Sequence, residues 1–102
     1  MIDLKSEYLQ EIKKILAKHA SDCEVRVFGS RVTGRAMTYS DLDLVLVGPH
    51  VLDLQKMIEI KQAFSESYLP ILVDVLDWNS ISDNFKKVIE EKYEVIQKPG
   101  VM

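Results

Sequence analysis

The chain has 102 residues, of which 47% are hydrophobic and 28% charged, and its formal net charge at pH 7 is −3. This length predicts one domain with one hydrophobic core, and the hydrophobic content excludes a disordered chain. The negative charge argues against general adhesion of the whole surface to nucleic acid, and leaves room only for a local basic patch.

The only cysteine, Cys23, excludes an internal disulfide and favours a cytoplasmic protein. Because no basic cluster surrounds Cys23, which precedes an apolar run, we expect a buried thiol rather than a nucleophile. The charged, amphipathic amino terminus does not resemble a signal peptide, and no apolar stretch approaches the roughly 20 residues that cross a bilayer. The sequence therefore predicts a soluble protein that does not bind membranes.

The first third of the chain predicts a helix, a strand and a short helical segment. Apolar residues recur at helical spacing over residues 3–19, and Asp3 is a candidate cap for this helix. Residues 24–28 alternate between polar and apolar side chains, as a half-buried strand does, and a Gly-Ser pair ends the alternation. A short helical segment is expected near residues 31–34.

The remainder predicts two strands and two helices. Residues 40–47 read SDLDLVLV, a strand that begins with acids and ends wholly apolar before a Gly-Pro stop. A helix is expected over residues 53–67 with Asp53 as its candidate cap, and residues 71–76 predict a third strand with one acid inside it. The segment Ser80-Ile81-Ser82-Asp83 has the form of a capping box and predicts the start of a last helix.

The predicted order of elements is α-β-(α)-β-α-β-α. This order is typical of an α+β protein in which helices flank a small mixed sheet. We expect one domain over residues 1–97. The Lys-Pro-Gly sequence that follows predicts a flexible C-terminal tail over residues 98–102.

Three aspartates are the most informative residues. Asp41 and Asp43 are separated by one residue of the second predicted strand, so both side chains point to one face, with Cβ atoms roughly 6.5–7 Å apart. Asp74 lies inside the third strand, where an unpaired buried carboxylate would be destabilising by several kcal/mol, so this residue needs a cation, strong hydrogen bonds or access to solvent. For Asp41 alone, a turn residue at the strand start is the favoured interpretation, but this does not explain Asp43 or Asp74.

Three acids that converge on hard cations account for all three positions. Oxygen ligands are those that Mg²⁺ prefers, and Mg²⁺ usually keeps water and substrate phosphates in its shell as well. The sequence shows no histidine and cysteine cluster near these acids, so a zinc site is not expected. We therefore predict a site for Mg²⁺ at Asp41, Asp43 and Asp74.

The second part of the predicted site lies upstream, where the first strand ends. Gly29 allows the backbone to approach a ligand closely, and Ser30 offers a hydroxyl and an amide. A helix that begins at this point favours an anionic phosphate, and Arg31 and Arg35 are candidates for the positive charge. A Gly-Ser pair is common by chance, so its value depends on the acids that follow it.

Gly29-Ser30, then ten residues, then Asp41-x-Asp43, and Asp74 on a later strand together resemble the signature of the DNA polymerase β-like nucleotidyltransferase superfamily. The stretch GSRVTGRAMTYSDLDLVLV is similar to the minimal members, the MNT-domain proteins. The likeness in layout covers nearly the whole chain and implies a polymerase β palm-like fold.

The resemblance also implies a two-metal nucleotidyl transfer. Asp41 and Asp43 would bind the two Mg²⁺ ions that hold the triphosphate of ATP, and Asp74 would complete the second metal site and help to deprotonate the attacking hydroxyl. Gly29 and Ser30 would hold the β- and γ-phosphates.

One position departs from the family pattern. Minimal members commonly carry a basic residue where Thr33 stands, so the phosphate clamp is in doubt unless Arg35 compensates.

Minimal members resemble the antitoxin half of HEPN/MNT toxin–antitoxin pairs, in which the nucleotidyltransferase adds AMP to a tyrosine of the HEPN ribonuclease and silences it. The resemblance therefore implies a helical HEPN-type toxin as the partner, and no strong binding of nucleic acid by this chain alone. Two other functions stay open. One is a module that neutralises a toxin by contact without catalysis, and the other is nucleotidyl transfer to a small-molecule hydroxyl, for which a homodimer would build the pocket.

Overall fold

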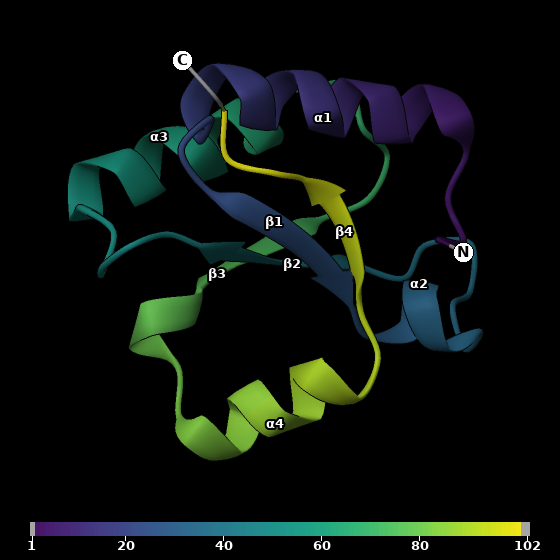
Figure 1. Cartoon of the computed structure of the whole chain (residues 1–102). Helices are drawn as coiled ribbons and strands as arrows, with labels where there is room; N and C mark the ends of the chain where they lie inside the picture. The colour runs from purple at the N-terminus through teal and green to yellow at the C-terminus, as the bar shows by residue number, and fades with distance from the viewer. Residues whose placement is uncertain (1, 101–102) are drawn as a thin grey trace.

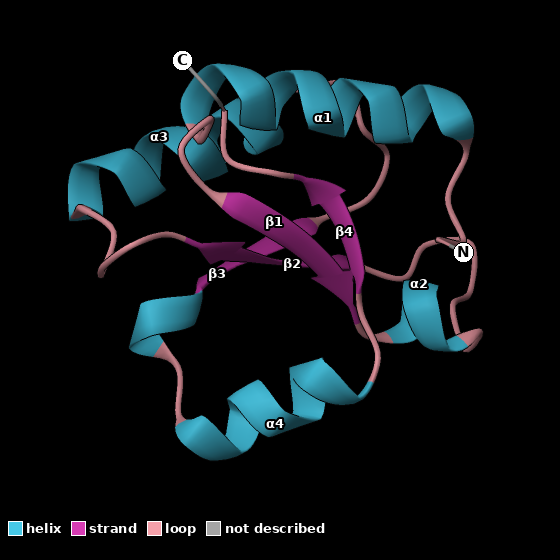
Figure 2. Cartoon of the chain, viewed as in Figure 1, coloured by secondary structure: helices cyan, strands magenta, loops and turns pink. Residues whose placement is uncertain are grey.

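The computed structural model describes residues 2–100, in which one mixed sheet is covered by helices on both faces (Figures 1 and 2). The sheet has four strands in the order β3-β2-β1-β4. Strand β1 is antiparallel to β2 and to β4, whereas β2 and β3 are parallel. The strands are β1 Glu24–Phe28, β2 Leu42–Val47, β3 Val73–Asp77 and β4 Glu94–Gln97.

Helices α1 and α3 lie on one face of the sheet, and α4 lies on the other (Figure 1). The short helix α2 follows directly on β1, and a 3₁₀ turn, η1, follows β3. The helices are α1 Ser6–His19, α2 Ser30–Thr33, α3 Leu54–Ser65, η1 Trp78–Ser80 and α4 Asp83–Glu91. None of the helices within residues 2–100 is long and apolar enough to cross a membrane.

Strand β2 contributes to both layers of the core. Leu42, Leu44 and Leu46 are fully buried in the larger cluster, which includes residues of α1 and α3. Val45 faces the other way and packs with Phe28 and residues of α4. The leucine alternation predicted for this strand is therefore confirmed, and the residues between the leucines, Asp43 and Val45, face the α4 side.

The helix caps differ in part from the predictions. Helix α1 begins at Ser6 rather than near Asp3, whose backbone N–H donates instead to the carbonyl of Arg31 at 2.7 Å. Asp53 is the N-cap residue of α3, but its side chain makes no capping hydrogen bond. Helix α4 begins at the predicted segment, but its cap is Ser82, whose Oγ accepts from the Phe85 N–H at 3.1 Å. The predicted capping box is not formed, because the Ser80 Oγ donates to Asp77 Oδ2 at 3.0 Å instead.

Strand β4 was not predicted. It is four residues long and becomes a strand only because β1, about seventy positions earlier in the chain, supplies its hydrogen-bonding partner. Beyond it, the Gly100 N–H donates to the Ser21 carbonyl at 2.7 Å. Residues 101 and 102 of the predicted tail lie outside the described part of the chain.

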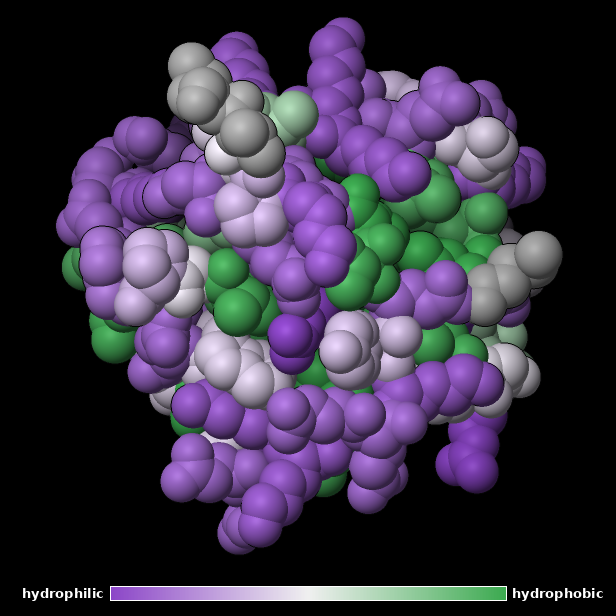
Figure 3. All heavy atoms as spheres, viewed as in Figure 1, coloured by the Kyte–Doolittle hydropathy of each residue, from purple (hydrophilic) through white to green (hydrophobic). Residues whose placement is uncertain are grey.

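The surface seen in Figure 3 is largely polar over α1 and α4. Apolar side chains reach the surface mainly between α1 and α2, beside β4 (Figure 3). This distribution is that of two amphipathic helices with their apolar sides turned toward the sheet.

Candidate active site

Strand register brings two of the three aspartates side by side. Asp43 is paired with Asp74 between the parallel strands β2 and β3, and it stands opposite Phe28 of β1. Because side chains alternate along a strand, Asp43 lies on the same face as Val45, toward α4. Asp41 precedes the first residue of β2 and is exposed. All three predicted acids therefore lie at one end of the sheet, where β1 ends and β2 and β3 begin.

The electrostatics show that these carboxylates influence one another. Asp43 is half-buried, and its pKa is raised above the ordinary 3.8, first by burial and then by the negative charges of Asp74 and Asp41. A carboxylate with two like charges beside it is stabilised by a cation. The three negative side chains thus favour a cation at the position where Mg²⁺ was predicted.

Asp74 is exposed rather than buried, because β3 is an edge strand of the sheet. Access to solvent was one of three ways in which the charge of Asp74 was expected to be satisfied, beside a cation and strong hydrogen bonds, and it is the one that the structure shows. Solvent alone satisfies this carboxylate, so its position does not by itself require a cation. Its significance lies in its register with Asp43.

The fit of the site to Mg²⁺ depends on the donor set. Within residues 2–100, no group of three or more histidine, cysteine or acidic side chains is arranged to hold a metal ion by itself, and Asp41, Asp43 and Asp74 are no exception. Mg²⁺ does not need such a group, since it commonly takes one or two carboxylates and completes its shell with water and substrate phosphates. The open set of carboxylates at this end of the sheet fits an ion of that kind.

Gly29 is needed where β1 meets α2. Its φ of +81° lies in the region that favours glycine, and a Cβ built at this position would collide with Oδ2 of Asp43. The Gly29 backbone therefore comes close to one of the acids, and its approach to a ligand stays a prediction. Ser30 begins α2 directly after Gly29.

The two arginines have different surroundings. Arg35 is exposed, two residues after α2 ends. Arg31 is buried, with 6% of its surface exposed, and its guanidinium group donates to backbone carbonyls of the N-terminal segment and of the loop before β2. The sequence indicated a cation here but not the carbonyl oxygens that it contacts, because they lie up to 28 positions away.

Ser40 was not singled out by the sequence. Its Oγ accepts from the Met37 N–H at 2.8 Å and closes the turn that precedes Asp41.

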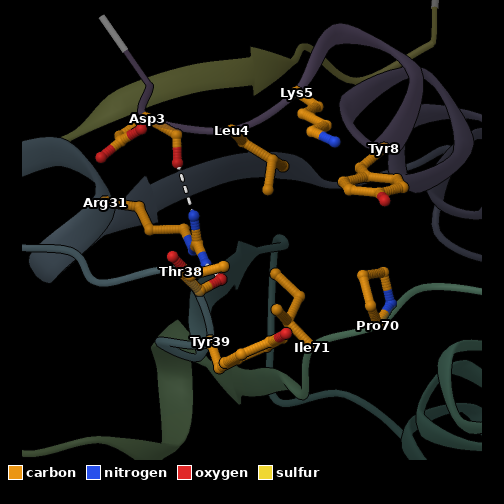
Figure 4. Close-up of a pocket in the computed structure, with 9 residues that line it drawn as sticks. All are labelled: Asp3, Leu4, Lys5, Tyr8, Arg31, Thr38, Tyr39, Pro70 and Ile71. Carbon is orange, nitrogen blue, oxygen red and sulfur yellow. Dashed lines mark hydrogen bonds between the residues drawn. The ribbon is translucent and has the colours of Figure 1, made fainter.

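A pocket of about 360 Å³ lies behind this turn (Figure 4). Its walls come from the N-terminal segment and α1, from the loop before β2, and from the segment before β3. Arg31 and Thr38 stand at one side of it, and Tyr8 and Pro70 at the other (Figure 4).

Cys23 is buried, as predicted, and takes no part in the site. Burial is the main cause that raises the pKa of its thiol to about 11. At neutral pH the thiol is therefore protonated and unreactive, so the interpretation of Cys23 as a core residue is confirmed.

Comparison with known proteins agrees with the geometry. Residues 9–96 match the family described as nucleotidyltransferase domain. The chain belongs to this family. It is 46% identical over 97 residues to a Haemophilus influenzae protein named "Probable protein adenylyltransferase MntA", and the match covers 95% of this chain and 85% of the relative.

Two solved structures share the fold. One is described as a toxin–antitoxin with AMP-PNP, and it superposes with a TM-score of 0.72 at 24% identity over 85% of this chain and 70% of the other. The second is a tri-AMPylated Shewanella oneidensis HEPN toxin in complex with MNT antitoxin. It has a TM-score of 0.67 at 21% identity and covers 90% of this chain and 71% of the other. The α+β nucleotidyltransferase fold implied by the resemblance is thereby confirmed.

Proposed function

We propose that this nucleotidyltransferase transfers AMP from ATP to a hydroxyl of a partner protein, a helical HEPN-type toxin, and so acts as the antitoxin. The observation that carries the proposal is the grouping of Asp41, Asp43 and Asp74 beside Gly29 in a chain nearly half identical to a protein named for adenylyl transfer to proteins. The related MNT antitoxin accompanies an AMPylated HEPN toxin, which supports this choice of acceptor.

In the proposed reaction, the acceptor hydroxyl oxygen attacks the α-phosphorus of ATP, a new O–P bond forms, and pyrophosphate leaves. Asp74, which is exposed at the edge of the sheet, takes the hydroxyl proton. Asp41 and Asp43 would hold two Mg²⁺ ions together with Asp74. When bound, these ions stabilise the negative charge of the attacking and leaving oxygens.

Gly29 and Ser30 would orient the β- and γ-phosphates, because the backbone of Gly29 comes close to Asp43 and the chain turns into α2 there. Arg35, which is exposed and lies two residues after α2, would supply positive charge to the triphosphate. The buried thiol of Cys23 fits a reducing cytoplasm, which we propose as the location of the protein.

The test is transfer of label from α-³²P-ATP to the purified HEPN partner in the presence of Mg²⁺. Asp43→Asn should abolish labelling, because it removes the carboxylate at the centre of the acidic group. Asp53→Asn is the control for the loss of one negative charge: Asp53 is an exposed acid that lies before α3, and its side chain makes no capping bond.

The same experiment distinguishes the other functions. Neutralisation of the toxin by wild type and Asp43→Asn alike, without label, would establish inhibition by contact and overturn the proposal. Label on a small molecule rather than on the partner would assign a different acceptor.

A further inference from the structure

All three nitrogens of the Arg31 guanidinium group donate hydrogen bonds to backbone carbonyls. Its Nε donates to the Ser40 carbonyl at 3.1 Å, and its Nη2 donates to the carbonyls of Thr38 at 3.1 Å and Ser40 at 2.9 Å. From the other side of the guanidinium group, Nη1 donates to the Asp3 carbonyl at 2.7 Å (Figure 4). Such a buried, planar group with several fixed donors suits a structural tie, and it leaves little of the guanidinium for a phosphate.

The tie to the N-terminal segment is reciprocal. The Asp3 N–H donates to the Arg31 carbonyl at 2.7 Å, while the Asp3 carbonyl accepts from the Arg31 side chain. Helix α2, which follows Gly29, is thus attached to the segment before α1. Arg31 therefore joins three parts of the chain that are remote in sequence or separated by a loop.

The loop that Arg31 holds leads directly to the acids. Residues 37–40 form a turn in which the Ser40 N–H donates to the Met37 carbonyl at 3.1 Å and the Met37 N–H donates to Ser40 Oγ at 2.8 Å. Asp41 comes next, is exposed, and has no strand pairing of its own. Its position relative to Asp43 is therefore set by the conformation of this turn.

We propose that Arg31 is a positioning residue, which fixes the turn over residues 37–40 and thereby places Asp41 beside Asp43 for metal binding, instead of binding the triphosphate itself. This inference rests on the proposed function, since it assigns Arg31 a part in the same reaction. The sequence led us to expect that Arg31 contacts a phosphate. In the proposal, Arg31 acts indirectly instead, through its hydrogen bonds to the carbonyls of Asp3, Thr38 and Ser40.

The first test is steady-state transfer by Arg31→Lys as a function of Mg²⁺ and of ATP. A lysine has no planar fork to reach the separate carbonyls, so we expect kcat to fall by about 10–100-fold at fixed Mg²⁺. The Mg²⁺ concentration for half-maximal activity should rise, whereas KM for ATP at saturating Mg²⁺ should stay within about twofold. A large rise in KM for ATP with unchanged Mg²⁺ dependence would overturn the inference and restore the phosphate contact.

Arg26→Lys is the matched control for a merely structural effect. Arg26 is also largely buried, but its contacts are with Glu24 and with the rings of Trp78 and Tyr93, whose centroids lie 4.8 Å and 4.6 Å from its guanidinium carbon, rather than with residues 37–40. This variant should lower the melting temperature without changing the Mg²⁺ dependence. An equal shift in Mg²⁺ dependence for both variants would show general destabilisation and overturn the inference.

A double-mutant cycle with Ser40→Ala provides an independent test. Removal of Ser40 Oγ loosens the same turn without changing Arg31. Each single change should therefore raise the Mg²⁺ concentration for half-maximal activity, and the effect of the double change should be smaller than the sum of the two single effects. Full additivity would show that the two residues act separately and would contradict the proposal.

Amide hydrogen exchange separates failure of this inference from failure of the proposed function. Arg31→Lys should speed exchange of the Ser40 amide relative to amides of β1, whether or not the protein transfers AMP. If wild type transfers no AMP but this protection is lost, the proposed function fails and the structural tie stands. If wild type is active and Ser40 stays protected in the variant, only the positioning role is overturned.

Discussion

At the scale of single residues, Gly29 and Gly34 both have a positive φ, but they differ in ψ, which is −156° and 14°, and in their surroundings. Both have positive φ, +81° and +84°, in a region that side chains with a Cβ rarely adopt. A Cβ at Gly29 would meet Asp43, whereas nothing lies within 4 Å of a Cβ built at Gly34. A side chain at either position therefore adds backbone strain, but only a side chain at Gly29 also meets one of the predicted site residues.

We expect Gly34→Ala to lower the free energy of unfolding by about 1–2 kcal/mol and to leave AMP transfer largely intact, since only strain is added. Gly29→Ala should show a similar or larger loss of stability and should also abolish transfer, because it displaces the Asp43 carboxylate. Urea unfolding and the transfer assay measure the two effects. Equal activity of the two variants would show that the close contact between Gly29 and Asp43 has no catalytic importance.

Asp43 makes stability depend on pH in a direction opposite to most carboxylates. Because its pKa is raised in the folded protein, the folded state binds the proton more tightly than the unfolded state does. In a buffer without divalent cations, this residue should therefore reduce the free energy of unfolding as pH rises from its ordinary pKa of 3.8 through the raised value.

Asp43→Asn should remove that decline, and at neutral pH without Mg²⁺ the variant should melt at a higher temperature than wild type. Thermal melts of both proteins across the acidic range test this. A wild-type stability that rises over the same interval relative to the variant would contradict the assigned direction.

At the scale of elements, the central helices and strands were predictable because their signals are local. The apolar spacing of α1, the alternation of β1 and the leucines of β2 each reflect burial of one side of a regular element. Element ends were less predictable. Aspartate is a common capping residue, but neither Asp3 nor Asp53 caps a helix with its side chain. Helix α1 begins three residues after Asp3, and Asp53 stands at the N-cap of α3 without a side-chain hydrogen bond.

The caps of α3 and α4 offer a direct comparison. We expect Ser82→Ala to lower the free energy of unfolding by about 1 kcal/mol, because it removes the acceptor for the Phe85 N–H at the start of α4. Asp53→Ala, at a cap position without such a bond, should have a distinctly smaller effect. Equilibrium unfolding in urea gives both values, and equal losses would show that the Ser82 bond contributes nothing particular.

At the scale of the whole molecule, residues near the C-terminus complete the sheet and meet the turn between α1 and β1. Strand β4 pairs with β1, and Gln97 Nε2 donates to the carbonyls of Ala20 at 2.8 Å and Cys23 at 3.0 Å. These contacts join parts of the chain more than 70 positions apart.

Gln97→Ala should therefore lower the free energy of unfolding by about 1–3 kcal/mol, since it leaves two carbonyls near the buried Cys23 without this donor. Activity of the folded fraction should be unchanged, because Gln97 lies at the opposite end of β1 from Gly29. If Gln97→Ala lost activity without losing stability, the conformation of β4 would affect the site, and this prediction would be wrong.

The sequence by itself determined the chemistry and the central elements: the Gly-Ser pair, the spacing of Asp41 and Asp43, and the alternation that turns the leucines of β2 into the core. These features depend on residues that are near one another along the chain. Only the tertiary structure decided that Asp74 stands in register with Asp43 on an exposed edge, that β4 is a strand, and that Arg31 holds the turn before Asp41. Each of these depends on partners far away in the sequence, whose hydrogen bonds and charges exist only once the sheet has formed.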